Sequence, residues 1–402
     1  MWIFKILLIS AMVHGTSIAQ VFKRIPVNEI LSSPRKIQFR EIITSSGGNM
    51  ILTSSMGLAD INGEQFSFDF PMGGLEDSKG NSMLMGQSSN ILIDSYKLHT
   101  GYKSIASGPD DIFYVVSDNN NFGFMDYKVG KGFGIPPFNF PNTINIRKIW
   151  IDKDGDLFVA ANDSFYIIKD AARVFDHKTK KTLYDSEFDK DSNVVITKGA
   201  KEIKRYSLGK NIHPYCFAGD DEGTTFIGTN HGLYQFEKKT GLFSNIFKNE
   251  DHPLTITCIE SSQSFSDMWF STLENGMGSY SVFSKSVYYY PYKNNNQLKN
   301  PVLNFIRLSN RELLVAIADS LPAFFNTETT SYEFINDTSF RTTRNSTTDI
   351  KTGAGKLTAL IRDGELFISK DLLKNRTLNP SRYYTGPYIK EFLSRVNLIR
   401  KK

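Results

Sequence analysis

The chain has 402 residues, a length that suits one large β domain or two ordinary domains. Phenylalanine (31) and tyrosine (18) are abundant, and apolar runs with helical periodicity are scarce, which favours an all-β protein. The formal net charge of +5 is accounted for by the six basic residues and one acidic residue from Arg382 onward. The rest of the chain is therefore nearly neutral and lacks the basic face that a nucleic acid requires.

The first 19 residues have the features of a secretory signal peptide. Lys5 supplies the positive charge, residues 6–13 form a short apolar core, and Ser17 and Ala19 precede a cleavage site before Gln20. The alternative is a membrane anchor, but the apolar run is short for a span, which needs ~20 residues. We expect a protein exported across the inner membrane, periplasmic or extracellular, with no membrane span after cleavage.

Residues 21–34 mix apolar and polar positions and can supply an outer strand that closes a ring against the last repeat. Repeats begin at Phe39. The clearest one, Ile212 to Lys248, reads as four short strands joined by three tight turns, with Gly223 and Gly232 nine residues apart. A single meander of this kind cannot bury its faces alone, so it needs copies stacked beside it. We expect Gly232 to take a positive φ between the second and third strands.

Copies of this unit recur along the chain. The glycine spacing is kept, in full or with one change, at Gly48–Gly57, Gly155–Ser164, Asp267–Gly276 and Gly355–Gly364. Weaker copies begin near residues 77, 110, 189 and 310, giving nine hairpin starts, most of them 30 to 45 residues apart. This period predicts a single all-β propeller of four-stranded blades. The short units 72–98, 101–127 and 184–206 leave the count open between nine and seven, and we favour seven.

The repeat resembles the two-component regulator propeller, whose motif is Asp-x-x-Gly-x-hydrophobic-Trp-hydrophobic-Gly-Thr-x-x-Gly-Leu. Phe226 to Leu233 match it best, with Phe in place of Trp, whereas Trp269 to Thr272 keep the Trp and Ser54 to Leu58 keep the Gly-Leu pair. The resemblance covers roughly residues 39 to 375. It implies the extracytoplasmic sensor domain of membrane histidine kinases, including hybrid sensors that respond to glycans.

In that family a small β-sandwich follows the propeller, and Pro387 to Ile389 look like the start of its first strand. We therefore divide the chain into a signal peptide (1–19), a propeller (20–380) and a basic tail (381–402). The resemblance then implies the sensor half of a receptor without its kinase. We expect the tail to be poorly ordered or lightly docked.

Two motifs suggest chemistry and fail on inspection. Asp152 to Asp156 cluster carboxylates as calcium loops do, but the glycine is fourth rather than sixth and Asp163 stands where a bidentate Glu is needed. Gly353 to Thr358 resemble a phosphate loop but place Leu357 after the lysine, where Ser or Thr is required. Both segments are explained as the turn of the repeat.

The histidines, the cysteines and a tyrosine-rich segment do not define a functional site from sequence alone. The six histidines show no metal-ligand spacing: His14, His99, His177, His213, His231 and His252. Cys216 and Cys258 lie on the first strands of neighbouring repeats, as a disulfide or as two buried thiols. Tyr288 to Tyr292 can stack on a sugar or pack between blades. We predict no metal, no cofactor and no catalytic residue, and leave the ligand-binding residues unassigned.

The leading hypothesis is a propeller that binds an oligosaccharide or a periplasmic or membrane protein. The glycan is implied by the resemblance alone. Two alternatives stay open, since propellers host unrelated functions. One is a hydrolase or lyase acting on polysaccharide, which a cluster of carboxylates or histidines at one mouth of the ring would favour. The other is a degenerate scaffold that binds nothing small.

Overall fold

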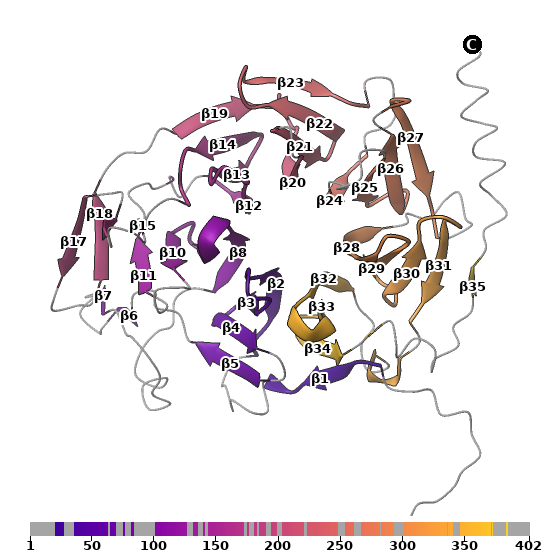
Figure 1. The fold of residues 1–402 in the computed structure, drawn as a ribbon, viewed down its shortest axis with the longest axis horizontal. Helices are drawn as coiled ribbons and strands as arrows, with labels where there is room; N and C mark the ends of the chain where they lie inside the picture. The colour runs from indigo at the N-terminus through magenta and orange to yellow at the C-terminus, as the bar shows by residue number, and fades with distance from the viewer. Residues whose placement is uncertain are drawn as a thin grey trace, which may run out of the picture.

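The computed structural model describes residues 21–27, 36–62, 65–69, 75–76, 82–83, 101–126, 132–135, 140, 144–172, 175–176, 181–182, 185–189, 194–198, 203–220, 223–247, 254–260, 267–281, 283–292, 301–335, 337–340, 346–370, 372 and 383–384. Its strands form seven four-stranded antiparallel blades around one axis (Figure 1). The predicted all-β propeller, with the favoured count of seven blades, is confirmed.

Within blades 1 to 6 the strands run from the axis outward in chain order. The inner strands are β2 (Phe39–Thr44), β8 (Tyr102–Ser107), β12 (Ile146–Ile151), β20 (Pro214–Gly219), β24 (Ile256–Glu260), β28 (Val302–Ser309) and, in blade 7, β32 (Thr347–Thr352). The second strands are β3 (Met50–Ser54), β9 (Ile112–Ser117), β13 (Leu157–Ala161), β21 (Thr224–Thr229), β25 (Asp267–Thr272), β29 (Glu312–Ile317) and β33 (Leu357–Arg362).

The outer half of each blade is more varied. The third strands are β4 (Gly57–Asn62), β10 (Phe122–Asp126), β14 (Ser164–Ile168), β22 (Gly232–Glu237), β26 (Met277–Ser281), β30 (Ala323–Asn326) and β34 (Glu365–Lys370). The outer strands are β5 (Gln65–Asp69), β11 (Gly132–Ile135), β19 (Ile203–Ser207), β23 (Leu242–Asn245), β27 (Ser286–Tyr290), β31 (Ser331–Phe334) and, in blade 7, β1 (Lys23–Ile25). Short 3-10 turns occupy Pro109–Asp111, Thr338–Phe340 and Ala354–Lys356.

The N-terminal segment closes the ring, as its position before the first repeat predicted. Strand β1 pairs antiparallel with β34, with Arg24 opposite Phe367. Phe22 is fully buried and its ring centroid lies 5.4 Å from that of Phe340. The Asp337 carboxylate accepts hydrogen bonds from the backbone N–H groups of Val21 and Phe22, each at 2.6 Å. Blade 7 is therefore built from both ends of the propeller sequence.

Two of the three short repeat units, 72–98 and 184–206, are not separate blades, whereas 101–127 supplies the first three strands of blade 2. Within 184–206, β17 (Asp185–Asp189) and β18 (Val194–Lys198) form a hairpin, and β18 pairs in parallel with β11 of blade 2. The rest of the unit is β19, the outer strand of blade 3. The described part of 72–98 is the hairpin of β6 (Leu75–Glu76) and β7 (Ser82–Met83), and β15 (Phe175–Asp176) pairs with β16 (Lys181–Thr182). The nine hairpin starts thus reduce to seven blades.

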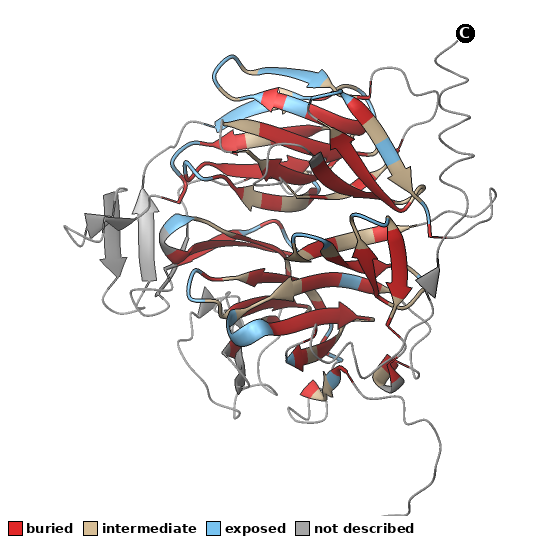
Figure 2. Cartoon of the chain, turned by 45° about the vertical axis from the view of Figure 1, so that its right-hand side comes forward, coloured by how far each residue is buried: buried red, intermediate tan, exposed pale blue. Residues whose placement is uncertain are grey.

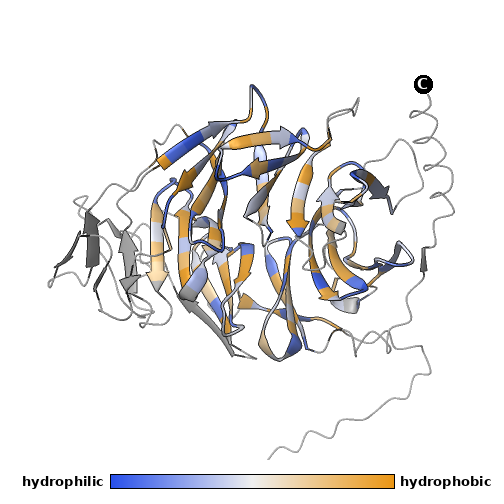
Figure 3. Cartoon of the chain, turned by 45° about the horizontal axis from the view of Figure 1, so that its top comes forward, coloured by the Kyte–Doolittle hydropathy of each residue, from blue (hydrophilic) through white to orange (hydrophobic). Residues whose placement is uncertain are grey.

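The core lies between adjacent blades rather than inside one sheet. All six residues of β9 are buried because both faces of a middle strand contact a neighbouring blade. Figure 2 shows buried residues along the inner and middle strands, with exposed ones in turns and outer strands. Figure 3 shows apolar residues along the same strands. This explains why these strands read as continuous apolar runs.

The glycine of the best repeat behaves as predicted. Gly232 has a φ of +94°, in the turn between β21 and β22. A Cβ built there would lie 2.8 Å from the Phe247 ring, so both backbone and packing require glycine. Gly355, in the segment considered as a phosphate loop, also has a positive φ of +64° in the turn from β32 to β33.

Of the basic tail, the structure describes β35 (Tyr383–Tyr384), which extends blade 6 by pairing with Glu333 and Tyr332. The predicted signal peptide and the segment from Pro387 to Ile389 lie outside the described residues, so the proposed domain boundaries stay predictions. Among the described residues, no helix is long and apolar enough to span a bilayer.

Candidate functional site

All seven inner strands carry a β-bulge at the same place. In each, the register with the second strand shifts between the first and third residues. The bulged second residues are Arg40, Lys103, Arg147, Tyr215, Thr257, Leu303 and Thr348. The third residues, which we call the belt, are Glu41, Ser104, Lys148, Cys216, Cys258, Asn304 and Asp349. Bulges re-aim side chains and are frequent beside functional sites.

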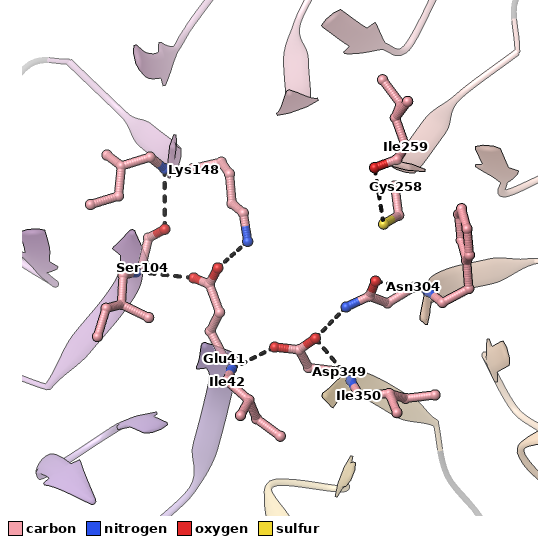
Figure 4. A network of polar contacts seen from close by, with 12 residues as sticks. Glu41, Ile42, Ser104, Lys148, Cys258, Ile259, Asn304, Asp349 and Ile350 are labelled. Atoms are coloured by element: carbon pink, nitrogen blue, oxygen red, sulfur yellow. Dashed lines mark hydrogen bonds and ion pairs between the residues drawn. The ribbon is translucent and has the colours of Figure 1, made fainter. Parts of the chain in front are cut away.

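The belt side chains labelled in Figure 4 point toward the axis, and those of Glu41, Ser104 and Asp349 connect one blade to another. Glu41 accepts a hydrogen bond from the Ile105 N–H of blade 2, at 3.2 Å, and forms an ion pair with Lys148 of blade 3. Ser104 accepts from the Ile149 N–H of blade 3, also at 3.2 Å. These contacts join blades 1, 2 and 3.

Asp349 makes the corresponding connection across the closing blades. Its carboxylate accepts hydrogen bonds from the Ile42 N–H of blade 1 at 2.6 Å, from Ile350 N–H at 2.9 Å, and from the Asn304 amide of blade 6. Burial raises the pKa of Asp349, and the positive charges of Lys351 and Lys148 act in the opposite direction. The carboxylate is thus a buried acceptor shared by three blades.

In the belt, the carboxylates around Lys148 outweigh the effect of burial on the pKa of its ammonium group. Burial by itself lowers the pKa of Lys148, but the carboxylates of Glu41 and Asp349 more than offset this and hold the pKa above its ordinary value. Lys148 therefore remains charged at physiological pH. The charged groups of Glu41, Lys148 and Asp349 are therefore used in contacts between blades.

Cys216 and Cys258 complete the belt on blades 4 and 5, and both are free thiols. Cys216 Sγ lies 3.9 Å from the Ile256 carbonyl oxygen of blade 5, and Cys258 Sγ lies 4.0 Å from the Ile259 carbonyl. Burial raises the pKa of both thiols. Of the two possibilities left open by the sequence, the structure has the free thiols.

The bulged residues form a different surface. They lie at the face of the ring where the inner strands begin and where a turn joins the second and third strands of each blade; we call it the bulge face. On blades 1 to 3 the bulged side chain contacts such a turn. Arg40 contacts the Asp118 carboxylate and the Tyr102 carbonyl oxygen, and Lys103 donates to the Asn120 amide oxygen. Asp118 and Asn120 both belong to the turn between β9 and β10.

The next two blades continue this surface. Arg147 donates from Nη1 to the Asn162 carbonyl oxygen at 2.7 Å, in the turn between β13 and β14. Its guanidinium lies 5.8 Å from the centroid of the Tyr215 ring. His213 Nδ1 is 2.7 Å from the same carbonyl oxygen. We call Arg40, Lys103, Arg147 and Tyr215 the arc, since they occupy equivalent positions on blades 1 to 4 and all are half-buried.

Blades 5 to 7 carry no charge at the bulged position. Thr257 donates to the Val302 carbonyl oxygen at 2.6 Å, and Thr348 contacts the Ile361 carbonyl oxygen at 3.4 Å. Leu303 lies between them in the ring. The bulged positions are therefore cationic or aromatic on blades 1 to 4 and uncharged on blades 5 to 7, where the neighbouring turns carry the carboxylates of Glu274, Asp319 and Asp363.

The rejected calcium loop turns out to hold a cation of the protein itself. Lys238 Nζ, in the turn between β22 and β23 of blade 4, lies 2.5 Å from Asp152, 2.9 Å from Asp154 and 2.7 Å from Asp156. Burial lowers the pKa of Lys238, but hydrogen bonds to the three carboxylates reverse this and raise it. The loop joins blade 3 to blade 4, as a structural turn should.

The tyrosine cluster mostly packs between blades. Within blade 5, Tyr289 meets Phe270 edge-on at 6.0 Å and Tyr290 contacts Trp269 at 5.6 Å. Tyr290 also packs against Phe325 of blade 6, at 5.7 Å. Tyr288 is 38% exposed, so it is the member of this cluster open to solvent.

The histidines show no metal site in the described part of the chain. Apart from His213 and His231, they lie outside the described residues. Among the residues described, no group of three or more His, Cys, Asp or Glu side chains is placed to hold a metal ion.

Comparison with known proteins yields structural neighbours but no match in sequence: no protein-family model and no curated protein matches the chain. The extracellular domain of BT4673 from B. thetaiotaomicron, assigned as a hybrid two-component system, superposes with a TM-score of 0.60. The identity is 15%, over 87% of this chain and 40% of that one. The corresponding domain of BT3049 from the same organism gives 0.59 and 12%, over 87% of this chain and 42% of that one.

Streptogramin B lyase gives a TM-score of 0.55 at 11% identity, covering 82% of this chain and 92% of that chain. At these identities the likeness establishes the fold, which sensors and an enzyme share. The chain spans about two fifths of the length of the two extracellular domains. The resemblance drawn from the repeat motif is thus confirmed at the level of the fold: the protein is a seven-bladed propeller similar to the extracellular domains of these hybrid two-component systems.

Proposed function

We propose that this protein is an extracytoplasmic ligand-binding propeller that works as the sensor part of a two-component receptor. Its ligand docks at the bulge face. The observation that carries this proposal is the set of seven equivalent bulges, which brings one side chain from each blade to the same mouth of the ring. All seven side chains are half-buried or exposed, so they can vary in chemistry without disturbing the core between the blades.

The arc favours recognition over catalysis. Arg40, Lys103, Arg147 and Tyr215 supply donors and an aromatic face, which bind and orient a ligand. A hydrolase or lyase acting on polysaccharide is the second candidate, because streptogramin B lyase has the same fold. It would need an acid and a base close together. At the bulge face the Asp118 carboxylate is bound to Arg40, and the Asp163 carboxylate is paired with Arg205.

A glycan is the ligand class that we propose, since the repeat motif resembles sensors of glycans. A periplasmic or membrane protein is the further partner that a sensor propeller needs to pass on a signal. The structural neighbours support an extracytoplasmic location because they are extracellular domains. We propose that the protein acts after export, without catalytic turnover of its own.

Thermal stability in the presence of purified oligosaccharides tests the proposal. A ligand that binds the native state raises the melting temperature in a concentration-dependent way. Tyr215→Ala should abolish the shift produced by any glycan that binds, because it removes the aromatic member of the arc. Tyr288→Ala is the matched control, since Tyr288 is exposed on the outer strand β27, away from the arc. A shift that survives Tyr215→Ala would place the ligand elsewhere.

The same incubations separate binding from catalysis. Mass spectrometry of the oligosaccharides after prolonged incubation should return them unchanged. Shortened chains, or chains with an unsaturated end, would instead establish a hydrolase or a lyase. If no glycan in a broad collection alters the melting temperature, the sensor proposal fails and the scaffold hypothesis gains.

A further inference from the structure

We propose that the ligand of the bulge face is an acidic oligosaccharide, whose carboxylate or sulfate groups bind Arg40, Lys103 and Arg147. This inference rests on the proposed function and specifies the class of glycan. It follows from the charges of the arc, their partners and their distribution around the ring.

The arc concentrates positive charge on three consecutive blades. Its partners include one carboxylate, that of Asp118, and are otherwise the neutral oxygens of Tyr102, Asn120 and Asn162. A carbonyl or amide oxygen orients a cation but does not neutralise it. An anionic ligand can supply the missing negative charge through charge-assisted hydrogen bonds, which are stronger than neutral ones.

Arg40 and Lys103 lie close enough to affect each other. The pKa of Lys103 is lowered chiefly by burial and further by the positive charge of Arg40, whereas Asp118 acts in the opposite direction. Neighbouring cations that disfavour each other's charge are a typical preparation for an anion, whose binding relieves the repulsion. In the absence of ligand, the Asp118 carboxylate provides part of this relief.

The sugar ring itself has a partner in Tyr215. This side chain is half-buried and lies beside Arg147, whose guanidinium is 5.8 Å from the ring centroid. An aromatic face offers apolar contact to a sugar, and an adjacent guanidinium offers a planar pair of donors that match a carboxylate or a sulfate. Together they fit a pyranose ring that carries an anionic substituent.

The other half of the bulge face makes the binding directional. Thr257, Leu303 and Thr348 present hydroxyl and apolar groups at the equivalent positions of blades 5 to 7. The turns beside them carry carboxylates, including those of Glu274 and Asp319, which repel an anionic group. A ligand that spans the mouth would therefore place its anionic groups over blades 1 to 3 and its neutral parts opposite. A short oligosaccharide that carries a negative charge on every sugar would instead bind over blades 1 to 4 only, along the arc.

Isothermal titration with three defined tetrasaccharides tests this inference. The probes are an oligogalacturonide, which carries carboxylates, a chondroitin sulfate tetrasaccharide, which adds sulfates, and neutral cellotetraose. We expect an acidic probe to bind, and its affinity to fall as salt is raised, since exposed charge interactions are screened. Arg147→Gln and Lys103→Gln should each weaken binding about tenfold or more. Lys239→Gln, which removes an exposed cation from the turn between β22 and β23, should leave the affinity unchanged.

The outcomes separate the inference from the proposed function. Binding of the oligogalacturonide alone identifies carboxylate recognition, and binding of the chondroitin probe alone identifies sulfate recognition. Binding of cellotetraose with equal affinity and no salt dependence overturns the inference and leaves the sensor proposal standing. Failure of all three probes overturns the inference, and the broad collection described above then decides the proposed function. The arc variants must melt at the wild-type temperature, so that lost binding is not lost folding.

Discussion

The two sides of the ring join their blades by different means at the same position of the same strand. On blades 7, 1, 2 and 3 the belt residues Asp349, Glu41, Ser104 and Lys148 form hydrogen bonds and an ion pair from blade to blade. On blades 4 and 5 the belt places thiols, whose contacts with carbonyl oxygens are long, at 3.9 and 4.0 Å. A thiol is a weak donor, so these blades need another source of cohesion.

Aromatic packing is one such source: between blades 4 and 5 the ring centroids of Phe247 and Phe270 lie 5.6 Å apart. Between blades 3 and 4 a cluster includes Phe158, Phe165, Phe217 and Phe236, and ring centroids lie 5.1 Å apart for the pair Phe165 and Phe236. Between blades 5 and 6, Trp269 packs against Phe325 at 5.4 Å. The difference shows that one backbone position can be served by electrostatics or left to the hydrophobic core, provided that the blades stay in register.

We expect the largest loss of stability from truncating one aromatic side chain between blades 3 and 4. Phe236 is fully buried and contacts Phe165 and Tyr206, so Phe236→Ala should destabilise the protein by about 3–5 kcal/mol through lost burial and a cavity. Phe283→Ala is the control, because Phe283 is 80% exposed, and it should stay within about 0.5 kcal/mol. Urea unfolding measures both. Equal effects would show that the aromatic cluster adds little to the joint between blades 3 and 4, which the Lys238 ion pairs also hold.

We expect a somewhat smaller loss of stability when the Asp349 carboxylate, which joins blades 6, 7 and 1, is removed. Asp349→Leu leaves the buried Ile42 N–H without its acceptor and should cost about 2–3 kcal/mol. Asp349→Asn, which keeps an acceptor, should cost less. Thr348→Ala changes the adjacent exposed residue and should lie within about 0.5 kcal/mol in the same unfolding experiment. If the leucine variant is as stable as the wild type, the belt does not hold the blades.

The turn glycines separate backbone strain from packing. Gly232→Ala and Gly355→Ala both place a side chain at positive φ, which costs roughly 1–2 kcal/mol. A Cβ at Gly232 also meets the Phe247 ring at 2.8 Å, whereas a Cβ at Gly355 meets nothing within 4 Å. We expect Gly232→Ala to be the more destabilising by about 1 kcal/mol, the cost of overpacking. Equal melting temperatures for the two variants would contradict this account.

The two buried thiols of blades 4 and 5 should make the free energy of unfolding depend on pH in the alkaline range. Burial raises the pKa of Cys216 and Cys258, so unfolding lets both thiols ionise at their ordinary value of 9.0. This stability contribution is fully present below pH 9 and declines as pH rises toward the folded-state pKa. Unfolding curves from pH ~8 to ~9.5, below the ordinary tyrosine pKa, should show the decline, and a Cys216→Ala, Cys258→Ala variant should reduce it. In the native protein, Cys258 should react with a thiol reagent before the more buried Cys216.

The smallest effect should come from the outer edge of blade 6, where neither mechanism operates. Deleting residues 383–402 removes only the two-residue pairing of β35 from the described structure and should shift the melting temperature by no more than about 2 °C. Deleting residues 20–25, which removes β1 and the buried Phe22, should be far more disruptive. If the tail deletion unfolds the ring, the tail contributes more to closure than its described pairing.

Much of the fold was predictable because the signals are local. Gly232 and Gly355 mark turns through their φ, and the apolar pairs between repeat glycines mark buried middle strands. The blade count was less accessible because β17 and β18 pair with blade 2 although they precede β19 of blade 3 in the chain. Such pairing depends on three-dimensional proximity, which repeat spacing does not encode.

The candidate site was missed for a related reason. Its sequence signal is a triplet of two polar residues followed by an aliphatic one, as in Arg40–Ile42, Lys103–Ile105 and Arg147–Ile149. In a regular strand, alternation would send the outer members of each triplet to one face and the middle one to the other. The bulge breaks that alternation, so the arc and the belt emerge only when the inner strands are aligned by their bulges.

The lysine between blades 3 and 4 has a consequence for how this joint responds to its surroundings. Calcium stabilises a folded state by mass action, so the joint it makes weakens when the free ion is scarce or chelated. The ammonium of Lys238 is part of blade 4 and contacts Asp152, Asp154 and Asp156 of blade 3. Because it is tethered by the chain, its effective concentration at these carboxylates is fixed. The strength of this joint therefore does not depend on the free calcium concentration of the compartment in which the propeller works.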